Sequence, residues 1–284
     1  MTLPTHAYRS WMFVPGDDSK KLCKALASEA DVVIFDLEDA VTPDRKDVAR
    51  SLTSATLHKP ARPARYVRVN DLSTGRTAED VAETIRGGPD GYVLPKCEGP
   101  QDIEALATMI RSHEPEHLPG ILAICTETVR AVRNLMRLDW AHPMLVGLTW
   151  GGEDLQADLG ARSNRTVDGR YLSAFAMARD LALIAARDAD VLAIDAVYTD
   201  FRNEPGLVEE ARLAKRLGFD GKMAIHPAQV DHIQTNLAPG QAEKDWAAKV
   251  IQLLEANKSG VAQLDGQILD QPHLKLAKKI LGAA

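Results

Sequence analysis

Short apolar runs recur along the chain, each bounded by turn-forming or helix-forming residues. Eight of these runs are four to six residues long and largely uncharged, the pattern of strands buried on both faces. They predict strands over residues 10–14, 31–36, 65–69, 91–94, 120–124, 144–148, 191–195 and 222–225. Amphipathic patterns between and after them predict helices over residues 18–30, 44–57, 77–86, 100–111, 128–138, 171–187, 204–217 and 227–234.

The alternation of strand and helix, repeated eight times, predicts a (β/α)8 TIM barrel of the α/β class. An open, doubly wound sheet is the main alternative for such a sequence. That fold usually has a glycine-rich nucleotide-binding turn after its first strand, whereas Pro15, Gly16 and two aspartates stand at this position. We therefore expect the closed barrel.

The pattern changes after residue 236, where all eight predicted strands have already been used. A Pro-Gly pair breaks the chain, and residues 241–257 then predict an amphipathic helix. A predicted hairpin over residues 261–269 and a last helix to about residue 281 follow. The sequence thus predicts a barrel over residues 1–236 and a C-terminal lid or oligomerisation segment over residues 237–284.

The composition is that of an ordinary globular protein, with 45% apolar and 26% charged residues. A net charge of −6 without a basic tract argues against a nucleic-acid partner. No run has the apolar core of a signal peptide or the length of a membrane span, so we expect a cytoplasmic protein without a membrane partner. Cys23, Cys97 and Cys125 lie far apart and predict neither a disulfide framework nor a zinc site.

Two acidic residues, Glu127 and Asp154, each follow one of the predicted strands by a few positions. Residues that follow parallel strands gather at one rim of an α/β barrel, where such folds place their chemistry. Carboxylates without histidine or cysteine partners suit a hard cation, so the pair predicts a site for Mg²⁺, with Mn²⁺ as an alternative. A 2-oxo or 2-hydroxy acid could chelate such an ion through its carboxylate and the adjacent oxygen.

Polar residues follow most of the other strands and are expected at the same rim. Arg68 presents a planar fork of donors, which suits a substrate carboxylate and a structural ion pair equally well. An acidic cluster after the second strand is expected to orient Arg68, Lys96 or metal-bound water. His226 is a candidate acid or base, although a packed loop histidine is the preferred interpretation. The expected substrate-binding or supporting residues are Arg9, Asp36, Glu38, Asp39, Lys96 and His226.

Six short motifs follow one another along the chain with regular spacing. They are RSWMFVPG from Arg9, DLEDAV from Asp36, RVN from Arg68, ET at Glu127, GEDL around Asp154 and KMAIHP from Lys222. This series resembles the citrate lyase β-subunit-like branch of the HpcH/HpaI aldolase superfamily, which includes malyl-CoA, β-methylmalyl-CoA and citramalyl-CoA lyases. The resemblance extends from Arg9 to about Ala277, nearly the whole chain.

The resemblance implies a TIM barrel assembled as a homotrimer or homohexamer. It implies that Glu127 and Asp154 hold Mg²⁺ and that Arg68 contacts the substrate oxygens. It also implies that Asp270, within the segment GQILDQP, reaches a neighbouring subunit's site as the acid or base. From the residues alone, Asp270 is also well explained as an N-cap ahead of Pro272.

The expected activity is a Mg²⁺-dependent, reversible Claisen-type cleavage of a 3-hydroxyacyl-CoA into an acyl-CoA and a 2-oxo acid. The substrate would resemble malyl-, citramalyl- or citryl-CoA, and Arg68 and Asp270 are the expected catalytic residues. Three alternatives remain open. They are a malyl-CoA-type thioesterase in which water attacks the thioester, a CoA-independent metal aldolase, and a non-catalytic citrate-lyase-type subunit.

Overall fold

A computed structural model describes residues 8–257 and 260–282 of the chain. Contacts between residues divide the chain into two units, Met1–Thr235 and Asn236–Ala284. Among the described residues, no helix combines the length and the apolar character that a membrane span requires.

Parallel strands of the first unit close into a barrel in which each strand pairs with the next and β8 pairs with β1. The strands are β1 (Ser10–Pro15), β2 (Val32–Asp36), β3 (Ala64–Arg68), β4 (Gly91–Leu94), β5 (Gly120–Ile124), β6 (Leu145–Thr149), β7 (Leu192–Asp195) and β8 (Gly221–Ala224). The TIM barrel predicted from the sequence is confirmed. Because all of these strands run in the same direction, their carboxyl ends meet at one rim.

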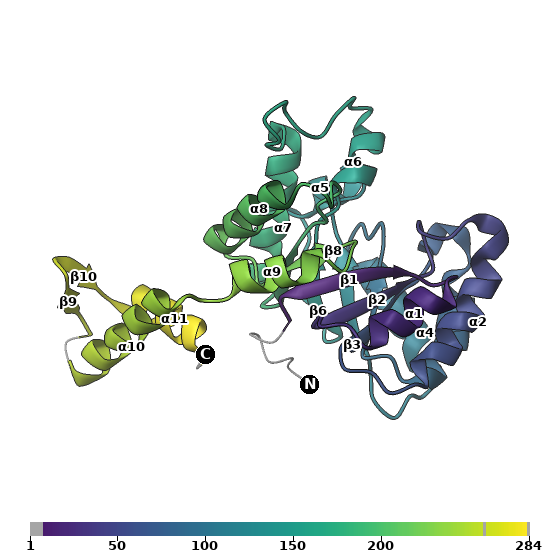
Figure 1. Ribbon diagram of the computed structural model, residues 1–284, viewed down its shortest axis with the longest axis horizontal. Helices are drawn as coiled ribbons and strands as arrows, with labels where there is room; N and C mark the ends of the chain where they lie inside the picture. Colours follow the sequence, from purple (N-terminus) through teal and green to yellow (C-terminus); the bar gives the residue numbers. More distant parts are fainter. Residues whose placement is uncertain (1–7, 258–259, 283–284) are drawn as a thin grey trace. The chain divides into compact units, whose positions relative to one another are not determined.

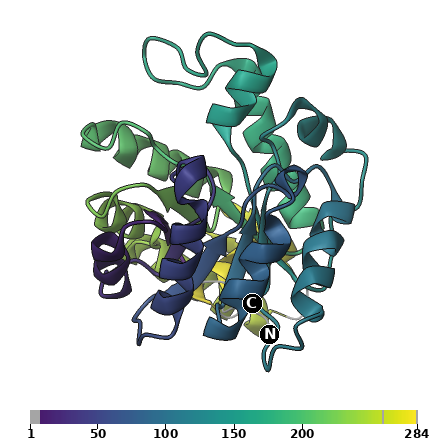
Figure 2. The same ribbon diagram turned by 90° about the vertical axis from the view of Figure 1, so that its right-hand side faces the viewer.

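Helices cover the outside of these strands (Figures 1 and 2). They are α1 (Ser19–Leu26), α2 (Lys46–Leu57), α3 (Thr77–Thr84), α4 (Pro100–Arg111), α5 (Val129–Asn134), α6 (Gly152–Leu159), α7 (Ser173–Asp188), α8 (Glu204–Leu217) and α9 (Gln229–Leu237). The sequence pattern predicts no helix between the sixth strand and residue 171, whereas the structure has α6 there. Two poor helix formers, Gly151 and Gly152, conceal the start of α6, and Gly160 ends it with a left-handed φ of 65°.

The barrel interior is filled by large apolar side chains. Its buried cluster consists of Trp11, Val32, Ile34, Tyr66, Val93, Leu122, Ile124, Leu192, Ile194 and Met223. The rings of Trp11 and Tyr66 meet edge to face with centroids 5.0 Å apart. Gly91 permits this packing, because a Cβ at that position would lie 2.1 Å from Cε1 of Tyr66. The interior is thus a packed core, and polar chemistry is left to the rim.

The second unit contains α10 (Gln241–Ala256), a hairpin of β9 (Ala262–Leu264) and β10 (Gln267–Leu269), and α11 (Gln271–Leu281). This is the helix, hairpin, helix order that the sequence predicts. The two helices lie side by side in Figure 1. They pack over a small buried core of Ala247, Val250, Leu254, Leu269 and Ala277.

Candidate active site at the barrel rim

Glu127 and Asp154 lie at the carboxyl ends of neighbouring strands and border one cavity. Ile124 and Thr149, the last residues of β5 and β6, are partners in the sheet, so the segments that follow them start side by side. Glu127 follows β5, and Asp154 lies in the first turn of α6. The cavity has a volume of about 360 Å³ and is lined by residues from strand ends around the barrel.

The Glu127 carboxylate is held in a buried position. Glu127 is only 4% exposed, and the backbone N–H of Lys96 donates to its Oε2 at 2.6 Å. Gly151 passes so close that a Cβ at this position would lie 2.8 Å from Cγ of Glu127. Burial, and after it the neighbouring carboxylates of Asp154 and Glu38, raises the pKa of Glu127 to about 8. A cation beside this carboxylate would relieve that unfavourable environment.

Lys96 connects the acidic cluster after β2 with the Glu127–Asp154 pair. Its backbone has a φ of 50°, a sparsely populated conformation of the kind that occurs at functional sites. The Lys96 ammonium contacts Oε1 of Glu38 and lies 3.6 Å from Oδ1 of Asp154. Burial raises the pKa of Glu38 to about 7 against the opposing charges of Arg68 and Lys96. Burial disfavours the Lys96 charge, but Glu38 outweighs it and raises the pKa of Lys96.

Arg68 is fixed at the cavity by Asp36, its partner in the β2–β3 register. Two guanidinium nitrogens, Nε and Nη2, donate to the two Asp36 oxygens at 2.8 and 2.6 Å. The third nitrogen, Nη1, lies 3.0 Å from Oε2 of Glu38. Burial disfavours the charge, but Asp36 and Glu38 outweigh it and raise the pKa of Arg68. The structural ion pair expected from the sequence is therefore present, and it sets the orientation of a charge that lines the cavity.

Two cavity-lining residues, Thr149 and Trp150, were not singled out from the sequence. The Thr149 hydroxyl is buried and has no hydrogen-bond partner among the described residues. The Trp150 indole donates its Nε1–H to Oδ1 of Asp195 at 2.7 Å. Their position between the sixth predicted strand and the GEDL motif is the signal that could have identified them.

The other predicted residues of the barrel lie at different places in the first unit. Asp39 is a half-exposed residue of the cavity wall, 3.6 Å from Nη1 of Arg68. Arg9 precedes β1, so it lies at the amino ends of the strands, the opposite end of the barrel. His226 is exposed, stacks on the ring of Phe201 with centroids 4.8 Å apart, and does not line the cavity. The structure thus brings Asp39 to the cavity but neither Arg9 nor His226.

Asp270 belongs to the second unit and stands directly ahead of α11. Its Oδ1 lies 2.6 Å from Nδ1 of His273, three residues further along the chain. The two side chains are 51% and 38% exposed. The N-cap position expected from the sequence is therefore observed, and the carboxylate remains accessible.

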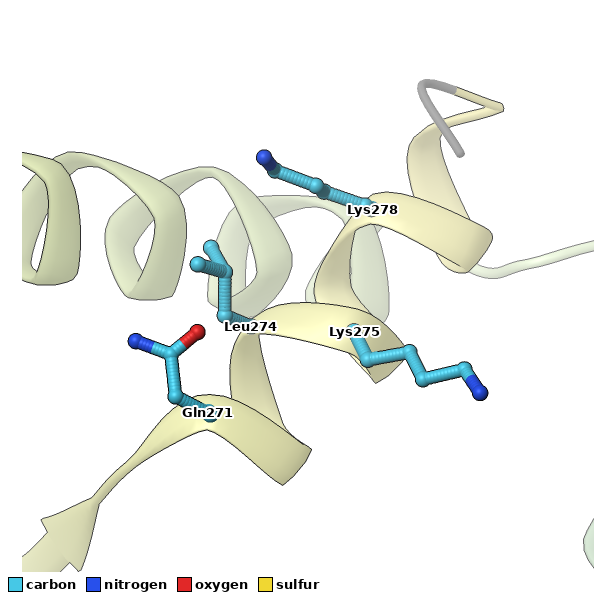
Figure 3. A pocket seen from close by; sticks show the side chains of 4 residues that line it. All are labelled: Gln271, Leu274, Lys275 and Lys278. Atoms are coloured by element: carbon cyan, nitrogen blue, oxygen red, sulfur yellow. The ribbon is translucent and has the colours of Figure 1, made fainter.

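A second hollow, of about 300 Å³, lies on α11 and is lined by Gln271, Leu274, Lys275 and Lys278. Figure 3 shows these side chains leaving successive turns of the helix, with Lys275 directed away from the other three. None of the four residues is buried, and Lys278 lies 3.7 Å from Glu255. Exposed lysines neither lose their hydration nor hold a reacting atom in place, so we assign the chemistry to the barrel cavity.

A buried ionic network connects β7 and β8 with α8. Lys222 is 0% exposed, and its Nζ lies 2.7 Å from carboxylate oxygens of both Asp195 and Glu210. Glu210 also meets Nη1 of Arg165 at 2.7 Å. Burial acts to raise the pKa of Glu210, but the Lys222 and Arg165 charges outweigh burial and lower it. The network therefore favours the ionised form of Glu210.

This network is expected to make the stability of the fold depend on acid pH. Because the pKa of Glu210 is lower in the folded chain than its ordinary value, the carboxylate stabilises the fold above that value. The contribution is lost as the pH falls through the folded-state pKa. We expect Glu210→Gln to be less stable than wild type near neutral pH, with the difference shrinking as the pH falls below the ordinary value of 4.5 and through the lower pKa of the folded chain.

Urea unfolding at a series of pH values measures this difference in the free energy of unfolding. Glu209→Gln is the matched control, because Glu209 pairs with Arg216 at the exposed surface. A constant difference between wild type and Glu210→Gln over the whole pH range would contradict the prediction.

Comparison with known proteins assigns the chain to a family. Residues 9–227 match HpcH/HpaI aldolase/citrate lyase. The chain is 34% identical over 291 residues to the citrate lyase subunit beta of Escherichia coli (strain K12), with 99% of this chain and 94% of that protein covered. It is 35% identical over 289 residues to a (3S)-malyl-CoA thioesterase of Cereibacter sphaeroides (strain KD131), with 100% of this chain and 97% of that protein covered.

A solved structure of CitE from Mycobacterium tuberculosis, in complex with magnesium, acetoacetate and coenzyme A, has the same fold. Its TM-score is 0.83 at 33% identity, with 98% of this chain and 99% of that chain covered. The resemblance that the six motifs indicate is therefore confirmed. The chain belongs to the HpcH/HpaI aldolase/citrate lyase family.

Proposed function

We propose that this protein is a Mg²⁺-dependent carbon–carbon lyase that cleaves a 3-hydroxyacyl-CoA reversibly into an acyl-CoA and a 2-oxo acid. The observation that carries the proposal is the presence of Glu127, Asp154 and Arg68 on one cavity at the barrel rim. Family membership supports the lyase class. The magnesium, acetoacetate and coenzyme A held by the related CitE protein are ligands of the kind this reaction needs.

Glu127 and Asp154 are the residues that would hold the ion. The unfavourable environment of the Glu127 carboxylate fits a site that a cation completes. Within the part of the chain that the structure describes, no group of three or more His, Cys, Asp or Glu side chains forms a metal site. Two protein carboxylates would leave the other coordination positions to water and substrate, as is usual for Mg²⁺. Such an ion, Mg²⁺ or Mn²⁺, supplies Lewis-acid polarisation of a substrate oxygen.

Arg68 would supply an oriented positive charge to the substrate. Because Asp36 fixes the plane of the guanidinium, a substrate carboxylate or carbonyl oxygen meets donors that are already in place. The unpartnered Thr149 hydroxyl could donate to a second substrate oxygen. In cleavage, the substrate hydroxyl would pass its proton to solvent water and become the carbonyl of the 2-oxo acid. The electron pair of the broken carbon–carbon bond passes to the acyl-CoA as an enolate.

Asp270 would protonate this enolate, or remove the α-proton in the direction of synthesis, at the site of a neighbouring subunit. General acid–base catalysis typically contributes about 10²- to 10⁴-fold. We therefore expect Asp270→Asn to lose turnover by about this factor while its Mg²⁺ affinity is unchanged. Release of 2-oxo acid from citramalyl-CoA measures turnover, and calorimetry measures Mg²⁺ binding.

Asp265→Asn is the control for this variant, because Asp265 is an exposed residue of the same unit. Its φ is 47°, a conformation that asparagine adopts readily. Unchanged cleavage by Asp270→Asn would remove Asp270 from the mechanism and leave it as the N-cap of α11.

A thioesterase is the second candidate, because a relative of 35% identity is a (3S)-malyl-CoA thioesterase. In that reaction water attacks the thioester in the same cavity, and the carbon–carbon bond stays intact. Separate assays of 2-oxo acid and of free CoA thiol distinguish the two. Release of 2-oxo acid with an intact acyl-CoA supports the lyase, whereas free thiol without 2-oxo acid supports the thioesterase.

The proposed reaction takes place in the cytoplasm, in a homotrimer or homohexamer. The thiols of Cys23, Cys97 and Cys125 are free, which suits a reducing compartment. Burial raises the pKa of Cys125, so its thiol is a packing group rather than a nucleophile beside Glu127. Because Asp270 is proposed to act at a neighbouring subunit's site, an oligomer is required, and analytical ultracentrifugation reports it.

A further inference from the structure

The residues that line the barrel cavity form two chemically different sets. The charged set includes Asp36, Arg68, Glu127 and Asp154, and the apolar set includes Phe13, Ile124, Trp150, Val197 and Met223. Arg68 is the one cationic side chain among the described residues that line the cavity. The Arg68 guanidinium lies 4.8 Å from the centroid of the Phe13 ring, so the Phe13 side of the apolar set is next to a positive charge. The lining residues Trp150, Val197 and Met223 carry no charge of their own.

Trp150, the largest residue of the apolar set, is anchored from behind by a chain of charge-assisted contacts. Its Nε1–H donates to Oδ1 of Asp195 at 2.7 Å, and Oδ2 of Asp195 accepts from Nζ of Lys222 at 2.7 Å. The same ammonium donates to Glu210 at 2.7 Å. Trp150 and Asp195 are each 2% exposed and Lys222 is 0% exposed, so water does not compete for these contacts.

A second support closes this chain of contacts into a ring. Glu210 meets Arg165 at 2.7 Å, and the Arg165 guanidinium lies 3.8 Å from the centroid of the Tyr171 ring. Tyr171 in turn packs edge to face on Trp150, with centroids 4.7 Å apart and an interplanar angle of 73°. The indole is thus fixed both through its N–H and across its ring.

Stability alone is a weak explanation for this arrangement. Buried ion pairs can often be replaced by apolar side chains of similar volume without loss of stability. A fully paired network does, however, hold its members in one geometry. Here the member that reaches the cavity is Trp150, so the geometry that is held is that of a cavity wall.

We propose that Trp150 is a specificity-determining wall of the cavity and that Asp195, Lys222 and Glu210 are positioning residues that hold it. The inference rests on the proposed lyase function and names the substrate class within it. The carbonyl carbon of the 2-oxo acid would carry hydrogen or a methyl group. A second carboxylate on this substituent would lie against Trp150, Val197 and Met223, which carry no charge, so malyl- and citramalyl-CoA fit and citryl-CoA does not.

The test uses the full-length protein with Mg²⁺ and the probes pyruvate, 2-oxobutyrate and oxaloacetate. Calorimetry gives the affinity of each 2-oxo acid, and kcat/KM is measured for citramalyl-CoA and citryl-CoA. We expect wild type to favour pyruvate over oxaloacetate by at least about 100-fold. Trp150→Leu is expected to raise the affinity for 2-oxobutyrate relative to pyruvate by about 10-fold or more, because it opens the wall.

Two Asp195 variants test the positioning role. Asp195→Ala removes the acceptor for the indole N–H. It is expected to raise the affinity for 2-oxobutyrate relative to pyruvate, as Trp150→Leu does. Asp195→Asn keeps an oxygen acceptor for the indole and loses only the acceptor for Nζ of Lys222, so the ratio of the two affinities is expected to return toward the wild-type value. A merely structural role would lower the unfolding midpoint of Asp195→Ala without moving the ratio.

Trp140→Leu is the matched control, because Trp140 is equally buried at 2% exposure but does not line the cavity. The inference is overturned if wild type binds oxaloacetate as tightly as pyruvate, or if Trp150→Leu keeps the wild-type ratio. A wild type that shows the binding preference but cleaves no acyl-CoA would defeat the lyase proposal instead. Cleavage of citramalyl-CoA with an unchanged ratio in the variants would defeat the inference alone.

Discussion

Turnover is expected to fall by at least about 1,000-fold when Glu127 is replaced by glutamine, and by a similar factor in Asp154→Asn. Glutamine has nearly the shape of glutamate but cannot offer a charged oxygen to a hard cation. Loss of the Lewis acid raises the activation free energy by several kcal/mol, and an increase of about 4 kcal/mol lowers the rate by a factor of about 1,000. Release of 2-oxo acid from the acyl-CoA substrates gives the factor directly.

Glu127→Gln is also expected to change the stability of the protein, in a way that a misfolded variant would not. Burial and two neighbouring carboxylates raise the pKa of Glu127 to about 8, whereas the ordinary value is 4.5. Near neutral pH the metal-free chain must therefore take up a proton at Glu127, or bury its charge, in order to fold, and either is unfavourable. Glu127→Gln removes this cost, because glutamine is neutral in both the folded and the unfolded chain. We therefore expect its metal-free unfolding temperature to equal or exceed that of wild type, while the rise that Mg²⁺ produces in wild type disappears.

Asp158→Asn is the control for these two variants. Asp158 lies in α6 like Asp154, but it is exposed and accepts the backbone N–H of Val129 at 2.6 Å, a bond that asparagine can keep. Wild-type turnover in Glu127→Gln, or an unchanged Mg²⁺-dependent rise in its unfolding temperature, would exclude Glu127 as a metal ligand.

The barrel could be predicted because its buried strands leave a local signal. A parallel strand covered on both faces must be apolar along its whole length, and each of the eight runs is short enough to be bounded by visible turns. Helix α6 left no such signal, because it begins at Gly152 and is preceded by Gly151, and glycine is a poor helix former. Its start depends on the rim geometry, and the local sequence does not report that geometry.

The same reasoning explains which candidate residues the structure gathers at the cavity. Asp36, Arg68, Glu127 and Asp154 each end or follow a strand, and the parallel topology is enough to bring them to one rim. Arg9 precedes its strand, so the same topology places it at the opposite end. A polar residue next to a predicted strand is therefore expected at the cavity only if it follows the strand, and not if it precedes the strand.

The network behind Trp150 lay beyond what the sequence could indicate. Its members Arg165, Asp195, Glu210 and Lys222 come from three elements and a loop. The closed barrel brings Arg165 to Glu210, and Lys222 to both Glu210 and Asp195, at 2.7 Å in each pair. Lysine side chains are mostly exposed in folded proteins, yet Lys222 is fully buried. Pairing of this kind depends on tertiary packing and has no period along the chain.

Arg68→Met is expected to combine a loss of turnover with a loss of stability. The substitution leaves the buried carboxylates of Asp36 and Glu38 without the guanidinium, and breaking a buried ion pair in this way costs about 3–5 kcal/mol. Urea unfolding measures this cost. Arg62→Met serves as control, because Arg62 pairs with Glu29 at the exposed surface and its loss is expected to cost less than about 1 kcal/mol.

A second substitution separates the structural from the catalytic role of Arg68. In the double variant Arg68→Met, Asp36→Asn, the more deeply buried carboxylate loses its charge together with its partner, so most of the lost stability is expected to return. Turnover is not expected to return, because the oriented donors for the substrate are still missing. Recovery of turnover together with stability would show that Arg68 only supports the fold and that another group binds the substrate oxygens.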